Sequence, residues 1–436
     1  MSDRARLAAY DVIRDCTDKG AYANLALART LRARRLGGRD AALATAVVAG
    51  TLRGLGTYDA IIDATVSRDL DPPVRDALRM GAHQLLAMRV PAHAALSTTV
   101  DITRKRIGHR PAGFVNAVLR TIAADSLEEW VRRVAPDRAE DPIGHLCVVH
   151  SHPRWVVESL AEALGDRRDE LADLLAADNQ SPRVTLVAQP GLSTVGELGG
   201  EPTISPLGVT LAQGDPADVP AVAQGRAGVQ DAGSQVVALA LAEASLDGVD
   251  QRWLDLCAGP GGKAALLAAI AAQRGVTLVA AELAPHRAHL VSGALGRLPG
   301  YVICADATQP PFAEGSFDRV LLDAPCTGLG ALRRRPEARW RRTPEDLEIL
   351  TDLQRRLLDS GLDLLRPGGL LVYATCSPVL AETSGVVSSV LARRDDVGLV
   401  PIQGPPDSEA SMSGAVQLWP HRHQSDAMFY ALLQRR

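Results

Sequence analysis

Apolar residues recur at intervals of three and four through the first 125 residues, the spacing of helices that bury one face. Clear examples are the sets Leu7, Val12 and Ile13; Leu25, Leu27 and Leu31; Leu43, Val47 and Leu52; and Ile61, Ile62 and Val66. Residues that disfavour helices interrupt this pattern at Gly37-Gly38, Gly54–Gly56 and Pro72-Pro73. Because strand-like runs do not occur there, this part of the chain is predicted to be an all-α bundle.

The stretch from 126 to 225 has a mixed pattern that prolines interrupt repeatedly. Residues 155–177 have helical spacing, whereas 183–188 and 209–214 are short apolar runs typical of strands. We therefore expect a small α+β connector between two larger parts.

From residue 226 onward, short apolar runs alternate with helical segments. The predicted strands are 252–257, 277–282, 301–305, 318–323 and 369–375, and the predicted helices are 262–273, 285–297 and 344–365. This alternation is typical of a parallel, doubly wound sheet. The chain is therefore predicted to be multidomain, with an all-α domain at 1–130, the α+β connector at 131–225 and an α/β Rossmann-like domain at 226–436.

Composition agrees with several globular domains. The 436 residues are too many for one ordinary core, and 46% hydrophobic with 22% charged residues is a globular composition. The net charge of −4 excludes a polybasic binder, but a local basic face would still allow nucleic acid to bind. Of the 47 basic residues only Lys19, Lys105 and Lys263 are lysines, so a lysine inside a motif draws attention.

The six cysteines include no C-x-x-C pair, so neither a metal site nor a redox pair is expected. No run of 18 apolar residues occurs, so no membrane span is expected. Charged residues interrupt the apolar positions at the start of the chain, and we expect no signal peptide. A soluble protein of the reducing cytoplasm, with free thiols, is the interpretation that follows.

A glycine-rich loop after the predicted strand 252–257 is the first candidate site, and it comprises Cys257, Ala258, Gly259, Pro260, Gly261, Gly262 and Lys263. Its glycines let the backbone approach a ligand, and the following helix start favours an anionic group. The next two predicted strands lead to Glu282, which could bind ribose hydroxyls, and Asp306. The alternative is a generic turn with solvated carboxylates. Because the loop lacks the P-loop and G-x-G-x-x-G patterns, S-adenosylmethionine is favoured over a dinucleotide.

Two cysteines follow the ends of the last two predicted strands: Cys326 comes just after Asp323, and Cys376 follows 369–375. Both would lie at the sheet edge where ligands bind, although a free cysteine is more often a buried filler. A thiolate that adds to carbon-6 of a pyrimidine makes carbon-5 nucleophilic, and a second group must then remove the carbon-5 proton. Asp323 could hydrogen-bond N3 and the exocyclic amine of the ring.

With these motifs the chain resembles the Nol/Nop/Sun family of RNA cytosine-C5 methyltransferases, and within it the branch acting on the ribosomal small subunit. The matching segments are Gln230–Gln235, Asp255–Lys263, Asp323–Gly328, Arg334–Pro336 with Trp340, and Tyr373–Ser377. The helical part resembles the NusB RNA-binding fold at Leu78–Gly81, Val90–Ala94 and Phe114–Arg120.

The resemblance implies that Cys376 is the nucleophile and that Cys326 assists product release, with Asp323 stabilising the adduct. It implies S-adenosylmethionine contacts at Cys257 through Lys263, at Glu282 (where Asp is usual), at Asp306 and at Asp323, with Lys263 beside the methionine carboxylate. The implied substrate is a cytidine of 16S ribosomal RNA in an unassembled or partly assembled small subunit. A tRNA cytosine-C5 methyltransferase and a catalytically idle NusB-related RNA-binding factor remain the alternatives.

A cluster of arginines surrounds Trp340 shortly after the cysteine motif, at Arg333–Arg335, Arg339, Arg341 and Arg342. Basic residues interleaved with an aromatic ring are typical of proteins that stack single-stranded RNA bases. We therefore predict RNA contact at this segment, the alternative being a solvated surface.

Overall fold

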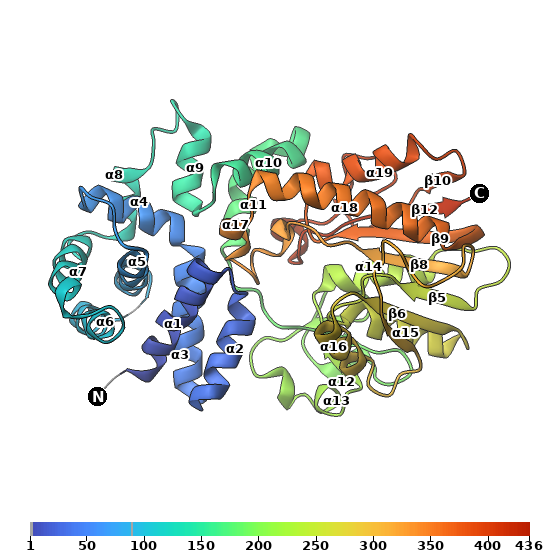
Figure 1. Cartoon of the computed structure of the whole chain (residues 1–436), viewed down its shortest axis with the longest axis horizontal. Coiled ribbons are helices and arrows are strands. Elements are labelled where there is room, and N and C mark those ends of the chain that lie inside the picture. Colours follow the sequence, from blue (N-terminus) through green and yellow to red (C-terminus); the bar gives the residue numbers. More distant parts are fainter. Residues whose placement is uncertain (1–2, 89) are drawn as a thin grey trace. The chain divides into compact units, whose positions relative to one another are not determined.

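The computed structural model describes residues 3–88 and 90–436, so residues 1, 2 and 89 of the first predicted domain lie outside the described residues. The chain divides into two compact units (Figure 1). The first comprises Met1–Glu158, Asp169–Asn179 and Arg334–Arg341, and the second comprises Ser159–Arg168, Gln180–Arg333 and Arg342–Arg436. The division into three domains at residues 130 and 225 stays a prediction.

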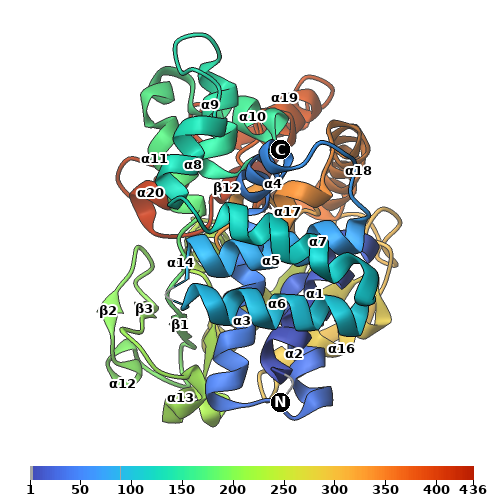
Figure 2. The same cartoon turned by 90° about the vertical axis from the view of Figure 1, so that its left-hand side faces the viewer.

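Helices make up the first unit. They are α1 (Arg4–Lys19), α2 (Ala23–Arg34), α3 (Gly38–Arg53), α4 (Leu55–Thr65), α5 (Pro72–Leu86), α6 (Ala92–Arg106), α7 (His109–Ile122), α8 (Leu127–Val134), α9 (Pro142–His150), α11 (Leu171–Asp178) and α17 (Ala338–Arg341). Figure 2 shows α5, α6 and α7 side by side. The all-α prediction is confirmed, and the expected breaks coincide with the starts of α3, α4 and α5.

Local sequence signals explain where several of these helices begin and end. Asp3 caps α1 by accepting a hydrogen bond from the Arg6 backbone N–H, and Gly20 ends the helix with a φ of 62°. Ser126 and Glu129 form a capping box at the start of α8. The apolar faces of α1, α3 and α5 then share one buried cluster that includes Ile13, Val47 and Met80.

The helix predicted over 155–177 is wrong as a continuous element. The structure has α10 (Arg154–Leu164), a 3-10 helix (Gly165–Glu170) and then α11. Gly165 has a φ of 56°, a left-handed conformation that ends α10. The apolar spacing on both sides of this break is helical, so the pattern alone concealed the interruption.

The second unit contains a small antiparallel sheet, which comes before the large sheet in the sequence. Its strand order is β2-β3-β1-β4, with β1 (Thr185–Ala188), β2 (Glu201–Pro202), β3 (Gly208–Thr210) and β4 (Ala227–Val229). The two strands expected here are neighbours in this sheet, although β3 ends earlier than predicted. The short helices α12 (Val195–Leu198) and α13 (Pro220–Ala223) contribute Leu198 and Ala221 to its core.

The large sheet of the second unit has the order β10-β12-β9-β8-β5-β6-β7, and β11 pairs with β12. Its strands are β5 (Arg252–Asp255), β6 (Thr277–Glu282), β7 (Tyr301–Cys304), β8 (Phe317–Asp323), β9 (Leu365–Thr375), β10 (Val397–Val400), β11 (Val416–Gln417) and β12 (Phe429–Arg435). The five strands β9, β8, β5, β6 and β7 are parallel, as predicted.

The prediction of a purely parallel sheet is wrong at one side. There β12 pairs antiparallel with β9, β10 pairs antiparallel with β12, and neither strand was predicted. An apolar run such as Phe429–Leu433 does not carry its own direction, because the path of the connection sets it. The sheet is therefore mixed.

Helices cover both faces of the large sheet and leave the carboxyl ends of its parallel strands as one edge (Figure 1). One face packs against α14 (Ala232–Glu243), α15 (Gly262–Gln273) and α16 (Pro285–Leu295). The other packs against α18 (Pro344–Asp363) and α19 (Ser384–Leu391). Another short helix, α20 (Pro420–His423), precedes β12. Among the helices that the structure describes, none is long and apolar enough to cross a membrane.

Candidate active site

The glycine-rich loop connects β5 to α15, and its conformation depends on glycine. Gly261 has a φ of 114°, and a Cβ there would lie 2.6 Å from the Ala294 Cβ and 2.9 Å from the Val291 Cα. The Ala258 N–H donates to the Ala281 carbonyl at 2.9 Å, which ties the loop to β6. The loop therefore presents backbone, without side chains, at the start of α15.

Glu282 ends β6, and its carboxylate bonds both this loop and the backbone just after β6. It accepts from the Gly259 N–H at 3.1 Å and from the Ala284 N–H at 3.0 Å, and its side chain is nearly buried. Arg287 donates to the Gly259 carbonyl at 2.7 Å and lies 3.5 Å from Glu282. The sequence indicated a ligand contact here, and the structure adds a role in ordering the loop.

Asp306 lies just beyond β7 and is exposed. Its Oδ1 accepts from the Thr308 hydroxyl at 2.7 Å and from the Thr308 N–H at 2.8 Å, and these hydrogen bonds hold the pKa of the carboxyl below its usual value. The side chain is therefore ionised and fixed in a turn. Cys257, by contrast, is uncharged, because burial raises the pKa of its thiol.

Two buried polar side chains beside the loop lack hydrogen-bond partners among the described residues. Both oxygens of Asp255 are buried and unpaired, as are both amide atoms of Gln230. Burial, followed by the charge of Asp323, raises the pKa of Asp255 to about 8, so its carboxyl is mostly protonated at neutral pH. Sequence analysis quoted both residues within motifs but gave neither a role.

Lys263 and Asp323 form an ion pair at the same edge, with 2.7 Å between Nζ and Oδ2. The Lys263 ammonium also donates to the Ser234 hydroxyl at 3.3 Å. Burial opposes the positive charge, but the neighbouring Asp323 outweighs it and raises the pKa of Lys263. The lysine that we expected beside a cofactor carboxylate thus also contacts the aspartate of the cysteine motif.

The structure brings Cys326 and Cys376 together, with 3.4 Å between the two Sγ atoms. They follow β8 and β9, which pair in parallel so that Asp323 lies opposite Ala374. Both cysteines are half-buried. The hydrogen bond with Cys376, burial, and the charges of Glu382 and Asp323 all raise the pKa of the Cys326 thiol. The Cys326 thiol therefore keeps its proton at neutral pH.

Glu382, which no sequence motif indicated, is fully buried six residues after Cys376. Its carboxylate accepts a hydrogen bond from the Thr327 N–H at 2.8 Å. A lone glutamate in a loop has no distinctive spacing, so no local signal pointed to it.

RNA contact at the segment around Trp340 stays a prediction, and the structure adds that this segment packs within the first, helical unit. The Trp340 indole donates to the Leu52 carbonyl at 3.2 Å and packs against the cluster that contains α1 and α3. Arg339 is fully buried and donates to the Ser151 carbonyl at 3.0 Å and to Asn179 at 2.8 Å. These contacts hold the segment in place. Arg339 is fully buried, whereas Trp340 is half-buried and Arg334 is exposed.

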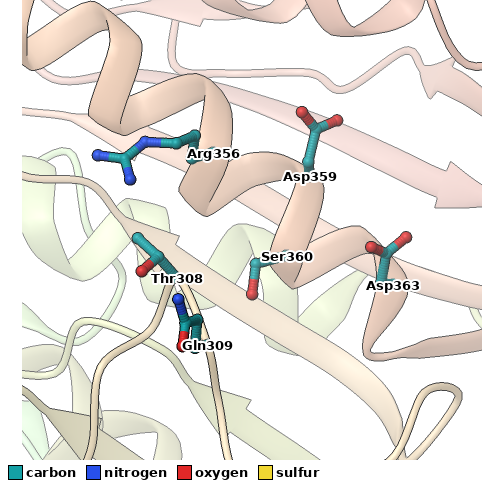
Figure 3. A pocket seen from close by; sticks show the side chains of 6 residues that line it. All are labelled: Thr308, Gln309, Arg356, Asp359, Ser360 and Asp363. Atoms are coloured by element: carbon teal, nitrogen blue, oxygen red, sulfur yellow. The ribbon is translucent and has the colours of Figure 1, made fainter.

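A pocket of about 350 Å³ lies on α18 and the loop after β7 (Figure 3). It is lined by Thr308, Gln309, Arg356, Asp359, Ser360 and Asp363. It adjoins the Asp306 turn, since the Ser360 hydroxyl donates to the Ala307 carbonyl at 2.7 Å. Neither cysteine lines it, and it is thus distinct from the thiol pair. In the part of the chain that the structure describes, no cluster of three metal-binding side chains occurs.

Two family models match the chain. The model described as "16S rRNA methyltransferase RsmB/F" matches residues 244–434, and the NusB family model matches residues 3–124. A putative methyltransferase of Mycobacterium tuberculosis is 49% identical, covering 99% of this chain and 97% of the relative. Ribosomal RNA small subunit methyltransferase B of Vibrio cholerae is 32% identical over 91% of this chain and 90% of its own length.

Solved structures have the same fold. The crystal structure of the protein PH0851 superposes with a TM-score of 0.82 and 24% identity, covering 100% of this chain and 99% of that chain. A methyltransferase homologue from Pyrococcus horikoshii gives a TM-score of 0.56 at 23% identity, covering 68% of this chain and 99% of its own.

Proposed function

The chain belongs to the RsmB/F family of rRNA methyltransferases, and from this membership we propose that it methylates carbon-5 of a cytidine in 16S ribosomal RNA through a covalent adduct to Cys376. The observation that carries the proposal is the pair of thiols 3.4 Å apart, next to Asp323, at adjacent strand ends. Carbon-5 chemistry needs a nucleophile and a second proton-handling group at one ring, and this pair supplies both.

S-adenosylmethionine is the proposed cofactor, and when bound it supplies an electrophilic methyl group. The residues proposed to hold it are those from Cys257 to Lys263 together with Glu282, Asp306 and Asp323. Two observations support the fit: Gly261 leaves a cradle that a Cβ would fill, and the buried polar side-chain atoms of Asp255 and Gln230 have no hydrogen-bond partner among the described residues. A ligand with donors and acceptors would satisfy such atoms.

Cys376 is the proposed nucleophile, and its thiolate attacks carbon-6 of the cytosine. The bond that forms places electron density on carbon-5. Carbon-5 would then take the methyl group of the bound cofactor, whose methyl–sulfur bond breaks to leave S-adenosylhomocysteine. The cationic Lys263 interacts electrostatically with Cys376, which favours the thiolate over the thiol. Asp323 lies beside Lys263 and is suited to hydrogen-bond N3 and the exocyclic amine, which stabilises the adduct.

Cys326 is proposed to take the carbon-5 proton, after which the bond from Cys376 to carbon-6 breaks and the ring becomes aromatic again. The Cys376 hydrogen bond is the largest cause of the raised pKa of Cys326. When Cys376 binds carbon-6, it loses its negative charge and that hydrogen bond weakens. The pKa of Cys326 then falls, so its thiol releases its proton to solvent and the resulting thiolate can take the carbon-5 proton.

The target cytidine must be single-stranded or flipped out, because a thiol cannot reach carbon-6 inside a base stack. A 16S rRNA that is unassembled or partly assembled, in the cytoplasm, meets this requirement. Bisulfite sequencing of rRNA and tRNA from cells with and without the gene tests the substrate. We expect one 16S cytidine to lose its methylation. A lost tRNA site would contradict the rRNA assignment, and no lost site would contradict the enzymatic assignment.

Substitution of each cysteine tests the mechanism. Cys376→Ala should abolish methyl transfer and leave S-adenosylmethionine binding intact, because the cofactor contacts lie in the glycine loop. Cys326→Ala should instead accumulate a covalent protein–RNA adduct, because the carbon-5 proton is no longer removed. The adduct is measured as a slow band on a denaturing gel that nuclease removes.

Cys147→Ala, a change in α9 of the helical unit, is the matched control and should behave as the unsubstituted protein. Turnover by the Cys376 variant would refute its assignment as the nucleophile. If the two variants exchanged their behaviours, the roles of the two cysteines would be reversed.

A further inference from the structure

Glu382 is a fully buried carboxylate between the two cysteine loops. It ends a 3-10 helix (Leu380–Glu382) and accepts hydrogen bonds from the Thr327 N–H at 2.8 Å and from the Thr327 hydroxyl. A third donor is the Gln354 side-chain amide at 3.0 Å. Its own carbonyl accepts from the Tyr373 hydroxyl at 2.7 Å, which anchors Glu382 to β9.

These hydrogen bonds reach both sides of Cys326. Thr327 follows Cys326 directly, and the Gln354 amide that contacts Glu382 also donates to the carbonyl of Pro325 at 2.8 Å. The residues before and after the thiol are thus fixed through one carboxylate. These contacts hold the Cys326 loop together with the hydrogen bond from the Ala324 N–H to the Ala374 carbonyl at 2.8 Å.

The same network reaches the loop of Cys376. Ser377 follows that cysteine, and its hydroxyl lies 3.0 Å from the Thr327 hydroxyl. Because Thr327 donates its proton to Glu382, Ser377 donates to Thr327, and a continuous chain runs from Ser377 to the carboxylate. Cys376 has a further anchor, since its carbonyl accepts from the Gly330 N–H at 2.9 Å.

We propose that Glu382 is a positioning residue that holds the thiol of Cys326 against Cys376 and thereby controls release of the methylated base. The inference rests on the proposed function, in which Cys326 removes the carbon-5 proton. A buried carboxylate is costly unless several donors pair with it, and here the donors come from both cysteine loops. Loss of the carboxylate would free the Cys326 loop before that of Cys376.

The charge of Glu382 acts in the same direction as its geometry. The groups that act on Cys326 are Cys376, Glu382 and Asp323, and all three raise the pKa of the Cys326 thiol. Glu382 therefore places Cys326, and its charge helps to keep that thiol protonated until Cys376 has bound the base.

Glu382→Ala tests the proposal in the full-length chain. Turnover should fall about tenfold or more, as expected when charged hydrogen bonds lose their acceptor. The covalent RNA adduct should accumulate as in Cys326→Ala, while S-adenosylmethionine affinity stays unchanged. Glu382→Gln should recover much of the release, because an amide can accept from Thr327 N–H and donate to its hydroxyl. A merely structural role would not produce an adduct.

A second measurement does not depend on activity. The oxidant diamide should join Cys326 and Cys376 as a disulfide, each thiol losing one proton and one electron as diamide is reduced to its hydrazine. Mass spectrometry follows the rate, which should be about tenfold slower in Glu382→Ala and near normal in Glu382→Gln. Thr327→Val, which removes one hydroxyl and leaves the carboxylate in place, should give an intermediate rate and covers the case in which the Ala variant fails to fold.

Two outcomes would overturn the proposal: a disulfide rate equal to that of the unsubstituted protein in both Glu382→Ala and Thr327→Val, or loss of S-adenosylmethionine binding without adduct formation. Failure of the proposed function has a different signature. In that case Cys326→Ala would not trap RNA, yet the disulfide rates would still distinguish Glu382→Ala from Glu382→Gln.

Discussion

Glu282 serves the glycine loop and the proposed cofactor site with a single carboxylate. Both oxygens already accept backbone N–H groups, from Gly259 and from Ala284, and a Cβ at Gly259 would lie 2.2 Å from the Glu282 Oε2. The loop and the acidic residue are therefore closely fitted. A substitution in the loop would displace Glu282, and a substitution of Glu282 would displace the loop.

Glu282→Ala should weaken S-adenosylmethionine binding by about 1–3 kcal/mol, or roughly fivefold to 150-fold in Kd, because the ligand loses a charged acceptor and the loop loses the hydrogen bond from the Gly259 N–H. Calorimetric titration with S-adenosylmethionine measures this change in Kd. Glu282→Asp should lose less, since it keeps the charge one methylene further back. Glu348→Ala, on the exposed side of α18, is the control. An unchanged affinity for Glu282→Ala would mean that Glu282 does not contact the cofactor.

The residues of the site that stand in motifs could be predicted from the sequence. The residues whose properties depend on burial could not. Cys326, Cys376 and the glycine loop follow apolar strands directly, so their common edge could be expected from the fold class. Asp255 was quoted without a role, and Glu382 was not noticed. The properties of both carboxyl groups depend on desolvation and on partners far away in the sequence. Neither can be recognised from the neighbouring residues.

At the scale of elements, α3 and α5 approach closely at Gly50. A Cβ there would lie 2.1 Å from two atoms of the His83 ring. That ring cannot easily give way, because His83 is buried and its Nδ1 lies 2.8 Å from the Tyr58 hydroxyl. Burial lowers the pKa of His83 to about 4, so the ring is neutral at pH 7. The glycine is what allows the two helices to pack.

Gly50→Ala should destabilise the helical unit by about 1–3 kcal/mol, the usual effect of overpacking a core. Gly113→Ala in α7 is the matched control: its Cβ would meet nothing within 4 Å, and alanine should stabilise the exposed helix by roughly 0.5–1 kcal/mol. Urea unfolding followed by circular dichroism measures both. Equal effects of the two changes would contradict the packing argument.

Elements with a strong pattern were predicted well. The breaks predicted between the first helices coincide with the observed starts of α3, α4 and α5. The helix α15 runs over Gly262–Gln273 as predicted. The antiparallel strands β10 and β12 were missed, and the helix predicted over 155–177 proved to be broken at Gly165. In these cases the local apolar pattern is compatible with more than one arrangement, and contacts with other elements decide between them.

At the scale of the whole molecule, the segment Arg334–Arg341 lies between β8 and β9 in sequence but belongs to the helical unit. Trp340 fills a space beside Gly56, where a Cβ would lie 2.5 Å from its ring. Arg339 stays charged at neutral pH, although burial lowers its pKa to about 10, and carbonyl oxygens surround it. The helical unit is therefore completed by a segment from the second half of the chain.

Trp340→Ala should destabilise the helical unit by roughly 2–4 kcal/mol, the range for truncating a large packed side chain. Thermal unfolding and limited proteolysis of α1 to α4 measure this loss. Ile349→Ala removes an apolar side chain that is 70% exposed and should change stability little. If Trp340→Ala left the stability unchanged and weakened RNA binding instead, the earlier expectation of base stacking would stand.

Properties that depend on neighbours along the chain could be predicted from the amino-acid sequence. These were the helical first part, the alternating strands and helices after residue 226, the glycine loop, and the two cysteines that follow strands. Hydrophobic periodicity and turn residues are local, so they can be recognised without the fold.

Contacts between residues that are far apart in the sequence depend on the tertiary fold. It placed two thiols 50 positions apart at 3.4 Å, buried Glu382 between their loops, and packed Trp340 into the helical unit. Such pairings depend on strand register, on the direction of each connection and on which polar groups lose water together. These quantities are properties of the packed chain, because burial and hydrogen bonding between distant segments arise only when the elements assemble.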